Sequence, residues 1–150
     1  MEVPADLQDS SKKIQPFVAA IVATNQPFQT ACVTIEQAVI EPRHWIDLLT
    51  RYSLPPRYEK GVSVTAAGQQ EIEAVLAAAF SDWVDFVFVP SPTRFVIYAD
   101  HDEYTTFYAQ TRSALKWIAE VLTGQGFETI TGMKGSLSRV IRLIVDVKSP

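Results

Sequence analysis

The chain has 150 residues, of which 47% are hydrophobic and 20% are charged, and its formal net charge is -4 at pH 7. This composition excludes a disordered protein, and the length suits one domain that buries about 70% of the surface its unfolded chain would expose. The acidic balance argues against general nucleic-acid binding, which uses clustered Lys and Arg side chains to neutralise phosphates.

The sequence contains one cysteine, Cys32, so we expect neither an intramolecular disulfide nor a zinc site made of cysteines. Residues 1–13 are polar and are expected to be frayed, and they lack the basic start and apolar core of a secretory signal. The longest apolar run, residues 17–23, is far shorter than the roughly 20 residues that span a bilayer. We therefore expect a cytoplasmic protein that does not interact with membranes.

The first regular element is a predicted helix, because apolar residues recur at helical spacing from Ile14 to Val22. Pro16 suits the first turn of such a helix, where a missing N–H has no cost. Pro27 disfavours helical angles in the residue before it, so the helix is expected to end by Asn25. The polar face is not rich in Lys or Arg, which favours a core-facing helix over a membrane-surface helix.

The next part of the chain carries helical signals with interruptions. Residues 29–52 predict two short helices with an elbow at Pro42, and Thr34 can cap the first of them. Residues 53–63 are expected to form a loop. A clearer apolar periodicity then predicts a helix over residues 65–82.

Two stretches rich in branched and aromatic residues, 83–89 and 94–99, predict strands. The link between them, Pro90-Ser91-Pro92-Thr93, has a length typical of a hairpin and lacks an N–H at two positions. We therefore predict an antiparallel β-hairpin.

A long helix is predicted over residues 104–122, where apolar residues form a stripe. Asp100 or Asp102 can cap it, and Glu103 stands at the capping-box spacing from Asp100. Threonines weaken its first half, so an extended conformation is the alternative for residues 104–110.

Residues 127–131 and 138–147 predict two more strands, joined by a turn at residues 132–136. Helices that precede a group of strands favour the α+β class. We predict one domain, residues 1–150, built on a mainly antiparallel sheet of about four strands. The sheet consists of two β-hairpins separated by the long helix, with the N-terminal helices packed on it.

The densest cluster of ionisable groups is Asp100-His101-Asp102-Glu103, at the end of a predicted strand. It is interpreted first as a helix N-terminus with a capping box, and alternatively as a protein-contact surface or as a metal or acid–base site. Aromatic residues gather beside it, and they are assigned either to the core or to a recognition surface. These aromatic residues are Tyr98, Tyr104, Tyr108 and Trp117.

No catalytic residue, metal site or cofactor is predicted with a recognised motif. Cys32 with His44 or His101 is the only possible thiol–imidazole pair, and the apolar neighbours of Cys32 favour an inert buried thiol. A small divalent-metal hydrolase would use Asp100, His101 and Asp102, but adjacent residues point in different directions.

The sequence therefore predicts a small cytoplasmic protein-binding module whose partner is another protein, with a basic protein as one candidate. The predicted partner-binding residues are Asp100, His101, Asp102, Glu103, Tyr104 and Tyr108. Small acidic α+β proteins of this size include immunity and antitoxin-like inhibitors, which is an analogy of class and does not settle function. The metal-dependent hydrolase, a structural subunit of a larger assembly and a regulatory ligand-binding domain remain as alternatives.

Overall fold

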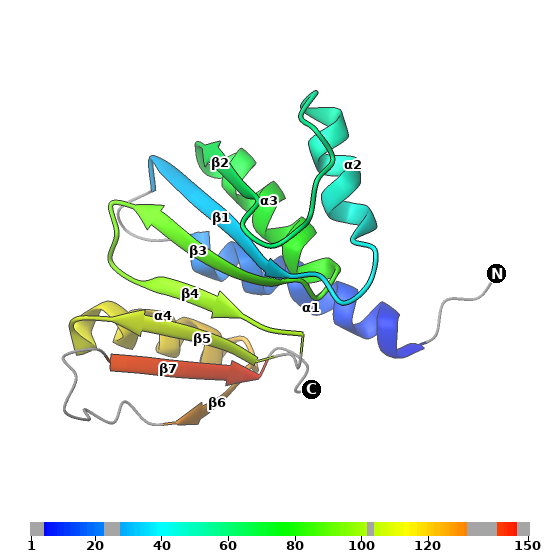
Figure 1. Cartoon of the computed structure of the whole chain (residues 1–150). Helices are drawn as coiled ribbons and strands as arrows, with labels where there is room; N and C mark the ends of the chain where they lie inside the picture. The colour runs from blue at the N-terminus through cyan, green and yellow to red at the C-terminus, as the bar shows by residue number, and fades with distance from the viewer. Residues whose placement is uncertain (1–4, 23–27, 102–103, 132–140, 147–150) are drawn as a thin grey trace.

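The computed structural model describes residues 5–22, 28–101, 104–131 and 141–146. Within these ranges the chain forms helices and strands that Figure 1 labels in chain order. The helices are α1 (Ala5–Val22), α2 (Arg43–Arg51), α3 (Gln69–Ser81) and α4 (Arg112–Gly124). The strands are β1 (Thr30–Gln37), β2 (Ser63–Ala67), β3 (Asp85–Ser91), β4 (Val96–Ala99), β5 (Tyr104–Ala109), β6 (Glu128–Thr131) and β7 (Ile141–Asp146).

The described strands form one seven-stranded antiparallel sheet in the order β2-β1-β3-β4-β5-β7-β6. Figure 1 shows α1, α3 and α4 on the same side of this sheet, behind the strands. No helix of the described residues lies on the opposite face. The predicted α+β class is thus confirmed, with a helix layer on one face of the sheet and an opposite face, here called the uncovered face, on which no described helix packs.

Burial along the strands follows this arrangement. In β1 the side chains of Ala31, Val33 and Ile35 are buried against the helix layer, while the residues between them are only partly buried. In β3 Phe86 and Phe88 are buried in the same way. Because successive side chains of a strand point to opposite faces, the partly buried residues identify the uncovered face of the sheet.

The centre of the core is Phe17 on α1, whose side chain is fully buried. Its ring centroid lies 5.2 Å from that of Phe80 on α3 and 5.1 Å from that of Phe127, which precedes β6. Phe107 on β5 lies 6.4 Å away in an edge-to-face arrangement. One side chain of α1 therefore joins α3 to the part of the sheet that contains β5 and β6 through aromatic contacts.

The first of the two short helices predicted within residues 29–52 is wrong, because Thr34, its expected cap, lies inside β1 and residues 38–40 are not helical. In this segment Ala31, Val33 and Ile35 alternate with polar residues at the period of two that a half-buried strand requires. β1 lies between β2 and β3 and pairs with both, so tertiary pairing outweighs the local helical signals. The second predicted helix of this region, after Pro42, is confirmed as α2.

Two other predicted helices begin later than expected. The one predicted over residues 65–82 begins at Gln69, because residues 63–67 pair with β1 and Gly68 adopts a φ of 84° that ends the strand. The one predicted over residues 104–122 begins at Arg112, and the alternative of an extended conformation for residues 104–110 is confirmed by β5. The additional strands β1, β2 and β5 account for the difference between about four strands and seven.

The first helix also differs from its prediction. It begins at Ala5 rather than near Ile14, so most of the segment expected to be frayed is helical and Pro16 stands in the helix interior.

The remaining predictions for the sheet are confirmed. β3 and β4 form the predicted antiparallel hairpin, with Val87 opposite Tyr98. β6 and β7 form the second antiparallel pair. The predicted turn at residues 132–136 lies outside the described residues.

We predict that Phe17→Ala lowers the free energy of unfolding by about 3–5 kcal/mol, because it removes a ring that is fully buried and leaves a cavity. Urea denaturation measures this change. The control is Val39→Ala, at a side chain that is 53% exposed, which should change stability by about 0.5 kcal/mol or less. Equal losses in the two variants would contradict the central role of Phe17.

Candidate functional site

The structure places the predicted acidic cluster at a turn between two strands. Asp100 and His101 follow β4, Tyr104 begins β5, and Asp102 and Glu103 lie outside the described residues. The interpretation as a helix N-terminus with a capping box is therefore wrong. Helix α4 is capped instead by Thr111, whose hydroxyl oxygen accepts a hydrogen bond from the backbone N–H of Ala114 at 3.4 Å.

Asp85, the first residue of β3, is a buried carboxylate that holds this turn. Its oxygen Oδ1 accepts the backbone N–H of His101 at 2.6 Å and lies 3.0 Å from the Nδ1 atom of the same histidine. Because an ionised carboxylate only accepts hydrogen bonds, Nδ1 carries the proton in this pair. The turn after β4 is thus fixed to β3 by a charged group inside the protein.

Asp82, at the end of α3, plays a similar part for helix α2. Its carboxylate accepts the backbone N–H of Trp45 at 2.9 Å and lies 2.7 Å from Nδ1 of His44. Pro42 stands at the N-cap of α2 and provides no side-chain cap, so Asp82 supplies the missing acceptor from another part of the chain. Each histidine of the chain is therefore oriented by a buried aspartate.

The two aspartates flank a strained turn between α3 and β3. Trp83 adopts a φ of 52°, which costs a residue other than glycine on the order of 1 kcal/mol. The hydrogen bonds to Asp82 and Asp85 stabilise the chain on either side of this turn. Neither aspartate could be assigned to such a role from the sequence, because their partners are distant along the chain.

Tyr98 of β4 lies on the uncovered face, in register with Val87 on β3 and Thr106 on β5. Burial raises the pKa of its hydroxyl above the ordinary value of 10.0, and the negative charges of Asp85, Asp100 and Glu36 raise it further. These carboxylates come from β3, from the turn after β4 and from β1. We define the acidic surface as Glu36, Tyr98 and Asp100, with the buried carboxylate of Asp85 beneath it.

The predicted tyrosines belong partly to this surface. Tyr108 is half-buried on the uncovered face, where it pairs with Val96, and it adds to the raised pKa of Tyr98. Tyr104 stands in register with Asp146 on β7. Trp117 belongs to the opposite layer, because it lies on α4 and packs against the core. The assignment to the core is therefore confirmed for Trp117, whereas Tyr98 and Tyr108 are half-buried on the uncovered face.

Sequence analysis did not identify Glu36 as part of the site. It was placed in a predicted helix, whereas in β1 it alternates with buried Ile35 and lies on the uncovered face. Recognition of the period-two pattern in residues 30–37 would have placed it at the same end of the sheet as Asp100.

A shallow groove of about 740 Å³ lies at the other end of β4 and β5, where Arg94, Val96 and Tyr108 line it.

The groups considered for chemistry are separated in the structure. Among the described residues no three His, Cys, Asp or Glu side chains come together as a metal site would require. Asp102, which the hydrolase hypothesis needs, lies outside those residues. Cys32 is half-buried on the uncovered face rather than fully buried as expected, and its sulfur lies 3.8 Å from the hydroxyl of Thr34.

Comparison of the chain with models of protein families, with curated proteins and with solved structures finds no match. In the part of the chain that the structure describes, no helix combines the length and the apolar character needed to cross a bilayer. The function must therefore be argued from the geometry of the surface itself.

We predict that Asp82→Ala lowers the free energy of unfolding by about 1–3 kcal/mol, because it leaves the buried N–H of Trp45 without its acceptor. Urea denaturation measures the loss. His44→Ala, which removes only the exposed partner of the same carboxylate, serves as the control and should cost less. If His44→Ala costs as much as Asp82→Ala, the ion pair rather than the helix cap stabilises this corner.

We also predict that Asp100→Asn lowers the pKa of Tyr98 towards 10.0, because it removes one of the negative charges that oppose ionisation of the hydroxyl. Absorbance titration of the tyrosines, with Tyr98→Phe to assign the signal, measures the shift. Because the ionised hydroxyl of Tyr98 is disfavoured in the folded state, the stability of the protein is unaffected by this group below about pH 10. It falls as the pH rises from there through the folded-state pKa. Asp47→Asn on α2 is the matched control, and an equal shift there would refute the assignment.

Proposed function

We propose that the chain is a small protein-binding module that uses the uncovered face of its sheet to bind a basic protein. The observation that carries this proposal is the position of Tyr98, half-buried on an exposed sheet face and under the influence of three carboxylates from different parts of the chain. The proposed binding surface comprises the residues predicted from the sequence together with Glu36 and Tyr98, and the buried Asp85 supports it from beneath.

The chemistry of this surface supports recognition. Tyrosines such as Tyr98 and Tyr108 provide contact area at a small entropic cost and are enriched at protein interfaces. Carboxylates beside them complement Lys and Arg side chains of a partner, which increases the rate of association and selects against acidic proteins. The buried carboxylate of Asp85 holds His101 in place before binding, so less order has to be created in the complex.

The class of inhibitor that fits these features is an immunity- or antitoxin-like protein in the cytoplasm, which binds a toxin or nuclease domain with a basic surface. The net charge of -4 and the position of the carboxylates at one end of the sheet support such a partner. The metal-dependent hydrolase remains the second candidate, because His101 is oriented through Nδ1 by a buried carboxylate as a catalytic base would be.

The test is affinity capture from cytoplasmic extract with the wild-type chain and with a Glu36→Lys/Asp100→Lys variant. We expect the wild type to capture one stoichiometric partner, and the variant to associate about 10-fold more slowly at low salt because its surface charge is reversed. Kinetic binding measurements with the captured partner at two salt concentrations give the rates.

The matched control is Asp47→Lys/Glu120→Lys, which makes the same change of net charge on exposed residues of α2 and α4. It should retain the association rate of the wild type. Equal effects of the two double variants would show that overall charge, and not the acidic surface, determines binding. Absence of a partner together with a bound divalent metal in the purified protein would favour the hydrolase.

A further inference from the structure

The edge strand β2 presents backbone groups that no described residue pairs. β2 neighbours only β1 in the sheet. The N–H of Ile35 on β1 donates to the carbonyl of Val62 at 2.8 Å, so by alternation Val64 also turns its backbone groups towards β1. The N–H and C=O groups of Ser63 and Thr65 therefore point away from the sheet.

The part of the β2 edge whose N–H groups are available for pairing ends before Ala67. The backbone N–H of Ala67, which follows the same alternation as Thr65, donates to the carboxylate of Glu71 at 3.1 Å. This bond confirms that the odd-numbered residues of β2 face outward and provides a local acceptor at its C-terminal end. Ser63, Thr65 and Ala67 are all exposed, and β2 contains neither a charged residue nor a proline, which are the usual protection of an edge strand.

An apolar groove runs beside this edge on the helix side. It has a volume of about 240 Å³, and Leu48, Tyr52, Leu54 and Val64 are among the residues that line it. Tyr52 is 49% exposed and Leu54 is 43% exposed. An unprotected strand edge and exposed apolar side chains thus occur together, which is the combination found at association surfaces.

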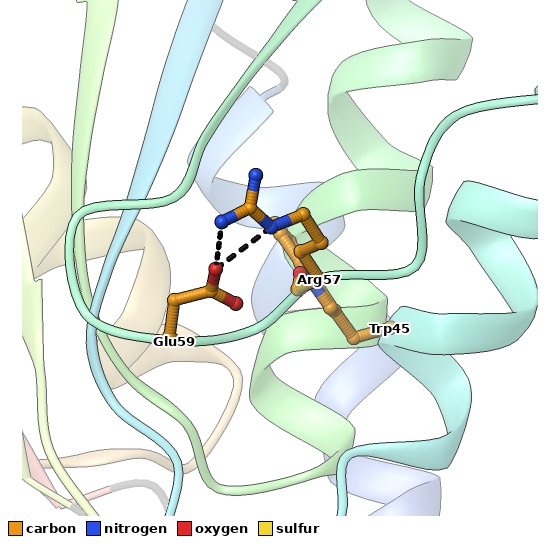
Figure 2. Close-up of polar contacts among 3 residues, drawn as sticks. All are labelled: Trp45, Arg57 and Glu59. Carbon is orange, nitrogen blue, oxygen red and sulfur yellow. Dashed lines mark hydrogen bonds and ion pairs between the residues drawn. The ribbon is translucent and has the colours of Figure 1, made fainter.

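The loop that leads to β2 is anchored to the fold (Figure 2). The indole N–H of the fully buried Trp45 donates to the carbonyl of Arg57 at 3.1 Å, and the guanidinium of Arg57 pairs with Glu59. Hydrogen bonds from the backbone and from Arg57 hold the pKa of Glu59 below its ordinary value. The charge of Glu59 is therefore balanced within the loop, whereas the structure assigns no ion pair among the described residues to exposed Lys60.

Opposite charges consequently flank β2, with Lys60 before it and Glu71 after it. We infer that the occupant of this edge is a second copy of the chain, paired antiparallel with β2 through a two-fold axis at Thr65. In this register Thr65 faces the second copy's Thr65, and Ser63 faces the second copy's Ala67, whose carbonyl accepts while its N–H stays with Glu71. The turn that holds Lys60 then lies at the same end of the contact as the start of the other copy's α3, which holds Glu71, so the two ends of the edge are complementary to each other.

The same pairing covers the apolar groove. Val64 and Ala66 point towards the helix layer, so the pairing brings the helix layers of the two copies side by side and covers Tyr52 and Leu54. The two seven-stranded sheets become one continuous sheet, and a two-fold contact of this kind closes without forming a fibre. The acidic surface around Tyr98 on β4 is three strands away from β2, or about 14 Å, and stays uncovered.

The test is sedimentation velocity of the full chain from about 1 µM to about 1 mM, a range that resolves even a weak dimer. We expect a concentration-dependent dimer that is at least about 10-fold weaker in Thr65→Pro and in Leu54→Lys. The proline removes an N–H that points outward, so the ladder with β1 is kept, and circular dichroism checks that each variant is folded. Ile40→Lys is the matched control for Leu54→Lys, because Ile40 is 60% exposed and lies outside the groove.

A charge exchange tests the register. Lys60→Glu should weaken the dimer, and Lys60→Glu/Glu71→Lys should restore it, which a general loss of stability would not do. A wild-type chain that is monomeric over the whole range overturns the inference. A dimer that Thr65→Pro and Leu54→Lys leave unchanged also overturns it, because the contact then lies elsewhere. Capture of a basic protein by the acidic surface is measured separately, so either proposal can fail alone.

Discussion

The structure depends on the burial of one face of the sheet under α1, with Phe17 at the centre of the contact. Its ring touches aromatic side chains from α3, from β5 and from the segment before β6, which lie 63 to 110 residues further along the chain. Such long-range aromatic contacts stabilise the arrangement of the strands as a set. Because the described helices form a layer on this one side of the sheet, the side chains on the other face are polar or only half-buried.

The polar features of the molecule follow from this division into two layers. Charged groups cannot enter the apolar layer without partners, and Asp82 and Asp85 are buried where α3 gives way to β3, each with hydrogen-bond donors from another element. These carboxylates connect α2 and the turn after β4 to the same corner. The corner therefore determines both where α2 begins and how His101 is presented at the edge of the acidic surface.

The sequence was informative where the local pattern and the tertiary environment agree. The β3–β4 hairpin, α2 and the last two strands have clear periodicities and turn residues, and the structure contains all of them. The assignments of β1 and of the start of β5 were wrong or open because Thr34 can cap a helix and because Tyr104 and Tyr108 fit a helical stripe as well as a strand. Only pairing with neighbouring strands decides between these conformations, and such pairing is a non-local property.

The candidate site was predictable only in its outline for the same reason. Asp100 and His101 were identified because they are adjacent in the chain, whereas Glu36 and Asp85 join them only through the register of β1, β3 and β4. That register also separates the charges of the sheet. Carboxylates gather at the end that holds Asp100, while the exposed Arg94 and Arg112 lie at the opposite end, near the groove beside Tyr108.

The net charge of -4 is thus distributed unevenly along the strands, and this polarity bears on what the uncovered face can bind. Under the function proposed above, a basic partner would be attracted at one end of β4 and repelled at the other, so it would have one preferred orientation on the sheet. The distribution of charge along the strands, and not the net charge alone, would then determine how such a partner is oriented.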